Sequence, residues 1–343
     1  MELVKEIIML SLVTFAVALA VTLFMGPVFI PWLKKLKFGQ EIREEGPKWH
    51  QVKSGTPTMG GIMFITGMAA AIIVTTILFA VRGNLDREFA RCLLLFGVSL
   101  GFGAIGFVDD YIKVVKKRNL GLTAIQKFSM QVVLAAIYVV VLYALGILNT
   151  AIKIPFTHIE WTMPLWLYIP FVMFIVVGVV NAVNLTDGLD GLASSITAVV
   201  AIFFILVSYI IFKAYGVTIF SAALFGGLLG FLWYNKYPAR VFMGDTGSLF
   251  LGAAVALMAI DLQMPVFLII VGFVYFMETL SVIMQTTYFK LTKRKYGEGR
   301  RIFKMTPIHH HFEMSGWNEK KIVTVFTCVT ALLCVIAWFG ILK

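Results

Sequence analysis

Two adjacent carboxylates, Asp109 and Asp110, end a glycine-rich apolar segment of the sequence. Glycines at 97, 101 and 106 precede the pair, and small residues let neighbouring helices approach closely. We therefore expect the two aspartates to lie in a packed crevice, the alternative being a solvated loop start. Neighbouring carboxylates in a medium of low dielectric constant are not both readily ionised unless a cation lies beside them. The pair predicts a site for a divalent metal ion.

Two further polar clusters follow apolar runs. Asn181, Asn184, Asp187 and Asp190 recur at every third residue, so a helical backbone aligns them along one stripe. Ionisable groups at membrane depth usually mark the path of a ligand or an ion, although a simple helix end broken by glycines is the alternative. Asp245 lies between Gly244 and Thr246, where it is either the N-cap of a helix or part of a helix N-terminus that offers free amides to a phosphate.

Three consecutive histidines, His309, His310 and His311, raise the question of which metal the site takes. Carboxylates and substrate phosphates are hard oxygen ligands, which suit Mg²⁺. Zinc is the competitor, but consecutive histidines on a regular backbone do not all face one metal, and no thiolate accompanies them. We expect the histidines to donate hydrogen bonds to a phosphate or a carbonyl.

Glu278 and Gln285 lie seven residues apart in one apolar run and share a helix face. Glu278 is expected to be buried, either in a structural hydrogen bond between helices or in a functional role. Gln285 lies closer to the basic end of the run and is better placed to contact a ligand.

The composition identifies the kind of protein that positions these groups. Apolar residues make up 60% of the 343 residues and charged residues 14%, whereas globular proteins have roughly 45–50% and about 25%. A membrane-spanning helix needs about 20 consecutive apolar residues. The sequence thus predicts an all-α polytopic membrane protein, one domain over residues 1–343, with ten transmembrane helices near 7–33, 59–81, 92–108, 128–148, 164–183, 191–212, 217–234, 248–262, 265–289 and 322–342.

Basic residues decide the orientation and exclude another class of function. With ten spans, 22 of the 29 lysines and arginines fall in loops on one side. The positive-inside rule places that side in the cytoplasm, together with all the polar clusters described above, and both termini outside. The net charge of +11 therefore comes from loops that flank spans and does not indicate nucleic-acid binding.

Five strings of residues carry a resemblance to a known family. They are GFVDDYIK (residues 106–113), NAVNLTDGLDGLA (181–193), FMGDTGSL (242–249), PIHHHFE (307–313) and KSGTPTMGG (53–61). The first three resemble motifs of the polyprenyl-phosphate N-acetylhexosamine-1-phosphate transferase superfamily at large. The histidine string and residues 53–61 resemble its peptidoglycan members, the phospho-N-acetylmuramoyl-pentapeptide transferases. The likeness covers essentially the whole chain.

The resemblance implies a fold, a reaction and partners. The fold is a ten-helix bundle in the bacterial plasma membrane, with the active site facing the cytoplasm. The reaction transfers phospho-MurNAc-pentapeptide from UDP-MurNAc-pentapeptide to undecaprenyl phosphate with Mg²⁺ as cofactor, giving lipid I and UMP. Family members resemble homodimers, so a homodimer is expected.

The resemblance also implies roles for individual residues. Asp245 is the metal ligand, and Asp109 is the base on the lipid phosphate with Asp110 beside it. Asn184 and Asp187 line the pyrophosphate site. The remaining residues that it assigns are His309 and His310 in catalysis, and Lys53, Thr58, Lys127, Asp190, Phe242, Gln285 and His311 in substrate binding, with Phe242 stacking on uracil and Gln285 reading its edge.

Two other functions and two mechanisms stay open at this stage. A sister transferase that makes another lipid-linked amino sugar would share the first three motifs. A transporter would account for ten helices and an intramembrane Glu278, but many transporter folds contain inverted repeats, and the sequence has none that is detectable. Within the transferase reading, direct attack by the lipid phosphate is favoured over a double displacement through an aspartate, because a phosphate monoester is already an anion near pH 7.

Overall fold

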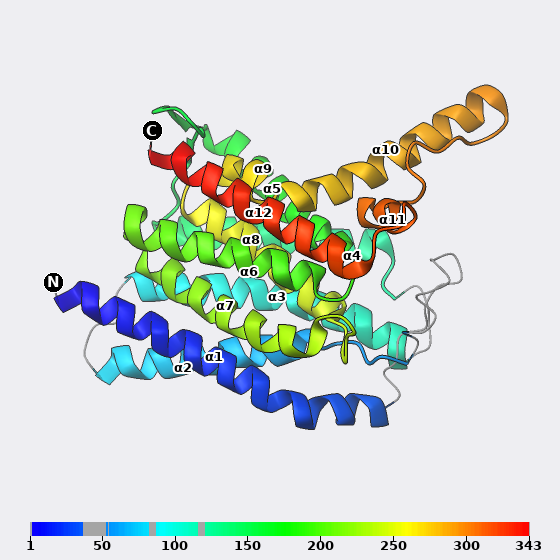
Figure 1. Ribbon diagram of the computed structural model, residues 1–343. Helices are drawn as coiled ribbons and strands as arrows, with labels where there is room; N and C mark the ends of the chain where they lie inside the picture. Colours follow the sequence, from blue (N-terminus) through cyan, green and yellow to red (C-terminus); the bar gives the residue numbers. More distant parts are fainter. Residues whose placement is uncertain (1, 37–52, 54, 82–86, 116–120, 343) are drawn as a thin grey trace.

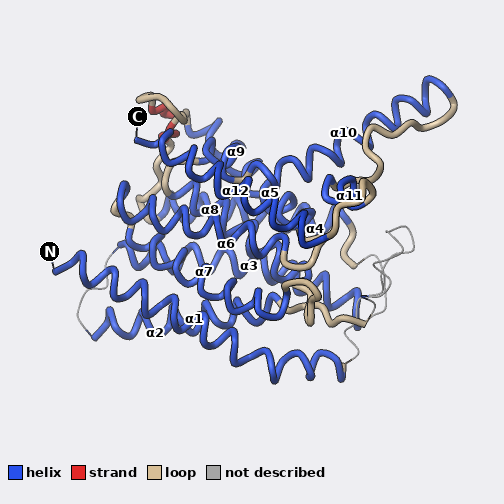
Figure 2. Tube along the Cα trace, viewed as in Figure 1, coloured by secondary structure: helices blue, strands red, loops and turns tan. Residues whose placement is uncertain are grey.

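The computed structural model describes residues 2–36, 53, 55–81, 87–115 and 121–342. Helices dominate it (Figure 1), and loops join them at the two ends of a bundle (Figure 2). The helices are α1 (Glu2–Lys35), α2 (Gly61–Val81), α3 (Arg87–Val115), α4 (Ala124–Ala144), α5 (Leu165–Thr186), α6 (Leu192–Leu206), α7 (Tyr215–Asn235), α8 (Gly244–Asp261), α9 (Leu268–Val271), α10 (Phe273–Tyr296), α11 (Ile308–Glu313) and α12 (Glu319–Leu342). A π-helical turn, Val207–Phe212, continues α6, and a 3-10 turn, Pro265–Phe267, precedes α9.

Nine helices of the described chain are long and apolar enough to cross a membrane, namely α1 to α8 and α12. Residues Pro265–Val271 and Phe273–Tyr296 pass the same test together and make a tenth crossing if the bent pair is one span. The prediction of a polytopic, multi-pass membrane protein is therefore confirmed. The predicted spans fall on these helices, with ends that differ by several residues.

The ninth predicted span, residues 265–289, differs from the structure in shape and length. Its two helical parts meet at Gly272 with a bend of 83°. The second part, α10, then runs on to Tyr296 and projects away from the bundle (Figure 1). Lysine and arginine at positions 293 to 295 are good helix formers and interact favourably with a helix C-terminus. The prediction that helix gives way to loop at residue 290 was wrong for that reason.

Helix α8 is the most enclosed element of the bundle. Every residue from Thr246 to Ile260 is buried, and α3 and α5 pack along it. Small residues make this possible: Gly252 lies against the backbone of Val180 in α5, where a Cβ would collide. The first turn of α8, which carries Asp245, is consequently held on several sides.

A short antiparallel hairpin, β1 (Ala151–Lys153) and β2 (Glu160–Thr162), joins α4 to α5. The sequence analysis predicted no strand here. Lys153 N–H donates to the Gln263 carbonyl at 2.9 Å, and Phe156 N–H donates to Gly340 at 3.0 Å. The hairpin thus packs on the ends of α8 and α12, as Figure 2 shows near the C-terminus.

Candidate active site

Three aspartates from two helices form an acidic cluster. Asp109 and Asp110 come from the C-terminal part of α3, and Asp245 comes from the first turn of α8. One carboxylate oxygen of each lies within 4.8 Å of the others, so the group could hold a metal ion. Asp109 and Asp110 are 2% and 3% exposed, while the Asp245 side chain is 17% exposed. Asp245 is therefore the member most open to a ligand.

Two glycines allow these helices to come so close. A Cβ on Gly106 of α3 would collide with the carbonyl group of Asp245. Gly244 has a φ of +74°, which disfavours other residues. A Cβ there would lie 2.6 Å from Asp110 and 2.9 Å from the Thr58 hydroxyl. The geometry of the acidic cluster thus depends on both glycines.

Asp110 caps the N-terminus of α8 from the neighbouring helix. Its carboxylate accepts hydrogen bonds from the backbone N–H of Asp245 at 3.1 Å and of Thr246 at 2.9 Å. The Thr246 hydroxyl donates a third bond at 2.7 Å. A helix N-terminus leaves its first amides without intrahelical partners and favours negative charge. Asp110 satisfies two of these amides and so fixes the position of Asp245.

The segment around Thr58 braces the same turn. Phe242 N–H donates to the Pro57 carbonyl at 2.8 Å, and Gly60 N–H donates to the Phe242 carbonyl at 2.8 Å. Thr58 is 5% exposed and lies in this contact, while Phe242 is half-buried. The part of the sequence near residue 53 that was assigned to substrate binding therefore also positions the start of α8.

Two lysines and an amide surround Asp245. Lys113 and Lys127 each place an ammonium group 2.8 Å from its Oδ2. Asn184 donates to its Oδ1 at 2.8 Å. Lys113 also pairs with Asp109, one helical turn earlier. Lys113 was not singled out from the sequence, although its i, i+4 spacing from Asp109 was a usable signal.

Asp187 adds a further carboxyl group next to the cluster. Burial raises the pKa of Asp187 well above its usual range, and the negative charges of Asp245, Asp110 and Asp190 raise it further. With Asp187 protonated and the three aspartates of the cluster ionised, the cluster carries three negative charges against the two lysines, which leaves an excess of one. An oxygen-only donor set with that excess fits a hard divalent cation such as Mg²⁺.

Lys53 lies in a second charged group, away from Asp245. Its ammonium donates to Asp190 Oδ1 at 2.7 Å and to the Glu319 oxygens at 2.7 and 2.8 Å. Glu319 Oε1 also accepts the backbone N–H of Asp190. All three protons of the ammonium are therefore used within the protein. Sequence reasoning missed Glu319, because nothing local indicates that it meets Lys53.

The three histidines face different partners, in agreement with the expectation that they do not share a metal. His309 is buried, and its Nδ1 lies 3.0 Å from Glu278. Its Nε2 lies against Gly188, where a Cβ would collide with it. His310 Nδ1 lies 2.7 Å from Glu313 of the same short helix.

His311 and Gln285, two further residues assigned to substrate binding, form hydrogen bonds with backbone groups. His311 Nδ1 accepts the Lys304 N–H at 3.2 Å. Gln285 donates to the Phe303 carbonyl at 3.0 Å and accepts from the N–H groups of residues 302 and 303. Gln285 thus fastens the segment that returns from α10, and its predicted contact with a ligand stays a prediction.

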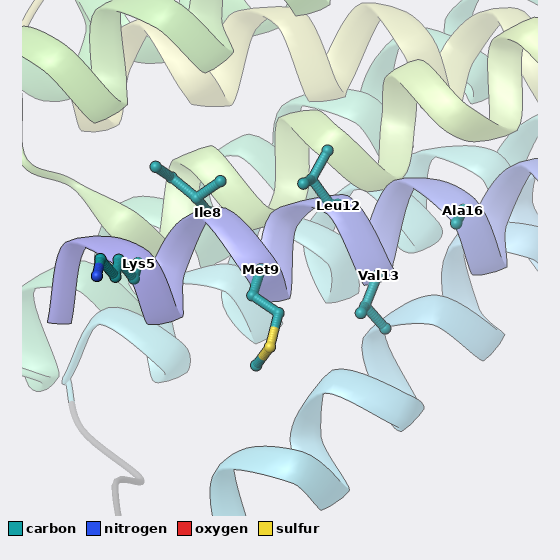
Figure 3. Close-up of a pocket in the computed structure, with 6 residues that line it drawn as sticks. All are labelled: Lys5, Ile8, Met9, Leu12, Val13 and Ala16. Carbon is teal, nitrogen blue, oxygen red and sulfur yellow. The ribbon is translucent and has the colours of Figure 1, made fainter. Parts of the chain in front are cut away.

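A hollow elsewhere on the molecule has no part in this site. It has a volume of about 430 Å³ and lies along the first half of α1 (Figure 3). Ile8, Met9, Leu12, Val13 and Ala16 line it with apolar atoms, and Lys5 is its one charged residue. None of the residues assigned to catalysis or substrate binding lines it.

The comparisons with known proteins identify the family. Residues 92–263 match Glycosyl transferase family 4, which defines the class as membrane-embedded transferases of that family. Residues 53–65 match signature 1 of phospho-N-acetylmuramoyl-pentapeptide-transferase. Proteins of that name are similar over nearly their full length: 48% identity in Acetivibrio thermocellus, covering 95% of this chain and 94% of that protein, and 48% in Clostridium perfringens, covering 98% and 99%. The chain belongs to the phospho-N-acetylmuramoyl-pentapeptide-transferase family, and the predicted family is confirmed.

Proposed function

We propose that the chain transfers phospho-MurNAc-pentapeptide from UDP-MurNAc-pentapeptide to undecaprenyl phosphate, giving lipid I and UMP. The observation that carries this proposal is the acidic cluster with two lysines on Asp245, in a chain whose relatives bear the name of that transferase. A phosphoryl transfer between anionic partners requires above all the neutralisation of negative charge. The site provides lysine cations beside oxygen ligands for one more cation.

We assign Mg²⁺ as the resident cofactor. Asp245 is its ligand, because Asp110 is committed to the α8 amides and Asp109 is kept for the base. When bound, Mg²⁺ neutralises charge on the pyrophosphate and polarises its oxygens. Lys113 and Lys127 hold the Asp245 carboxylate and supply point charges to the same phosphates.

The donor pocket extends from Asp245 towards Lys53. Asn184 and Asp187 line the pyrophosphate part, and Phe242 offers a flat ring for the uracil base. Lys53, Thr58 and Asp190 bind the uridine and phosphate groups, with Gln285 and His311 at the edge of the pocket. Lys53 reaches a phosphate only by giving up a bond to Glu319, since its three protons are already used.

His309 and His310 complete the catalytic set from α11. Glu278 accepts the Nδ1 proton of His309, which leaves Nε2 directed at the turn that carries Asp187 and Asp190. His310 is held by Glu313 in the same way. Both rings are thus oriented by a carboxylate, an arrangement that fixes the tautomer of a histidine.

Direct attack by the lipid phosphate is the mechanism that this geometry favours. Asp110 already accepts three hydrogen bonds, and Asp109 accepts the Leu122 N–H at 2.8 Å and pairs with Lys113. Asp110 is therefore not free to attack phosphorus as a double displacement requires. A phosphate monoester, with a second pKa near 6, needs little activation, and Asp109 serves as its base.

The setting follows from the same proposal. The site faces the cytoplasm of a bacterium from the plasma membrane, both termini lie outside, and residues 1–343 form one domain that pairs as a homodimer. The acceptor stays in the bilayer while its phosphate reaches the acidic cluster at the membrane surface.

The test is a transfer assay with purified protein, undecaprenyl phosphate and Mg²⁺, offered UDP-MurNAc-pentapeptide and, in parallel, UDP-GlcNAc. The proposal expects lipid I and UMP from the first donor and none from the second. Transfer from UDP-GlcNAc would instead identify a sister transferase. Without undecaprenyl phosphate, labelled UMP should not exchange into the donor, because direct attack leaves no covalent intermediate; exchange at the rate of turnover would establish a double displacement.

A further inference from the structure

A polar cavity lies at the end of the bundle opposite the acidic cluster. Helix α8 connects the two, since it begins beside Asp245 and ends at Asp261, a distance of about 24 Å at 1.5 Å per residue. The cavity has a volume of about 370 Å³. The polar residues of its lining that matter here are Arg87, Glu88, Arg91, Tyr168 and Asp261. None of these residues has a role in the proposed transfer reaction.

Two residues that line this cavity carry a buried polar atom with no hydrogen-bond partner within the described part of the chain. The atoms are Arg91 Nε and Asp261 Oδ2. A buried polar group without a partner destabilises a fold. Two such atoms in the lining of one polar cavity indicate that something fills it and bonds to them.

The charges of the cavity indicate the chemistry of that ligand. Glu88 is already engaged, since it accepts from Arg91 at 2.9 Å and from the Gly216 N–H at 3.2 Å. The carboxylate that remains available is Asp261, and the available cationic donors are Arg91 Nε and the neighbouring Arg87. The cavity therefore places a carboxylate oxygen and a guanidinium N–H, both without a partner in the described part of the chain, beside a second guanidinium group.

We propose that this cavity binds a zwitterion that carries a primary ammonium and a phosphate, the chemistry of phosphoethanolamine. The ammonium donates to Asp261 Oδ2 and to the Tyr168 hydroxyl, while the phosphate accepts from the two arginines, whose guanidinium groups match phosphate geometry. The cavity lies at the end of the membrane-spanning helices, where lipid headgroups are found. The ligand is either the headgroup of phosphatidylethanolamine or a free phosphoethanolamine.

Binding is measured on the full-length protein in two arms. In the first arm, detergent-solubilised protein is titrated with radiolabelled phosphoethanolamine and, separately, phosphocholine. In the second arm, protein in nanodiscs of phosphatidylethanolamine or phosphatidylcholine is compared for bound lipid by native mass spectrometry. A quaternary ammonium cannot donate a hydrogen bond, so we expect choline compounds to bind at least tenfold more weakly in the arm that shows binding. Binding in the first arm identifies a site open to free zwitterions, and binding in the second arm alone identifies a lipid site.

Variants separate this site from others at the same end of the bundle. Asp261→Asn should weaken binding at least tenfold, and Tyr168→Phe, which keeps the ring, provides a second variant if the first does not fold. Glu160→Gln removes a carboxylate from the exposed hairpin at the same end, outside the cavity, and should leave binding unchanged. Any of three results would overturn the proposal and leave a cavity filled by water. They are equal binding of ethanolamine and choline compounds, binding that both cavity variants retain, and no binding in either arm.

Discussion

Replacing Gly106 by alanine tests how strictly the contact between α3 and α8 sets the active site. The added Cβ would approach the Asp245 carbonyl to well under 3.0 Å, a separation that real Cβ atoms essentially never show. The neighbour is backbone and cannot rotate away, so the two helices must separate by about 1 Å near the acidic cluster. A misplacement of that size lowers a rate by about 100-fold. Overpacking of this kind also destabilises by roughly 1–3 kcal/mol.

The same helix provides a graded set of controls. A Cβ on Gly97 meets nothing within 4 Å, and one on Gly103 has its nearest neighbours at 3.4 Å. We expect kcat for lipid I formation to stay within about twofold of wild type in Gly97→Ala, to fall slightly in Gly103→Ala and to fall about 100-fold in Gly106→Ala. Thermal melting of each purified variant confirms that it is folded. A Gly106→Ala protein that keeps half of the wild-type kcat would refute the reasoning.

Three further predictions concern carboxylates around the site. Asp110→Asn should lower the melting temperature, because the α8 amides lose a charged acceptor whose bonds contribute about 1.5–3 kcal/mol each; an unchanged melting curve would contradict the capping role. Burial and neighbouring charges raise the pKa of Asp187, so its ionised form destabilises the fold at pH 7. Asp187→Asn should therefore melt at a higher temperature than wild type in metal-free buffer. This difference in melting temperature should close as the pH falls below about 3.9, where the wild-type carboxyl is protonated in both the folded and the unfolded state. A difference in melting temperature that widens as the pH falls would contradict the prediction, because it would mean that ionised Asp187 stabilises the fold. Glu319→Gln should lower the KM for the donor about threefold with kcat unchanged, because it releases Lys53. The exposed Glu298→Gln is the control. A higher KM would show that Glu319 positions Lys53 for the substrate instead.

The membrane architecture could be predicted from the sequence because long apolar runs have one stable solution in a bilayer. Every predicted span falls on a helix of the structure. The bend at Gly272 could not be predicted, because it depends on packing between α9, α10 and α12. The extension of α10 to Tyr296 was missed although the basic residues at 293 to 295 favour a helix. The hairpin at residues 151–162 was missed because each of its strands has only three residues.

The residues of the site were easier to name than their partners. Asp109, Asp110 and Asp245 stand out by residue type, and a cation beside them was predicted from charge alone. The capping of α8 by Asp110 and the contact between Lys53 and Glu319 join residues 135 and 266 positions apart. No local pattern reports such pairs. The sequence therefore indicated the chemistry of the site. Only the structure shows that Asp110 caps α8 whereas Asp109 pairs with Lys113.

The most direct test of the central claim is the rate of lipid I formation by Asp245→Asn at saturating Mg²⁺. Asparagine keeps the shape of the side chain but removes the charge that pairs with Lys113 and Lys127 and that the proposed Mg²⁺ would require. Glu298→Gln, an exposed carboxylate with no role in either site, is the control. The account predicts that Asp245→Asn remains folded and loses more than nine-tenths of the wild-type rate, while Glu298→Gln keeps it. An Asp245→Asn protein that retains more than about a tenth of the wild-type rate would contradict the assignment of Asp245 as the residue on which phosphoryl transfer depends.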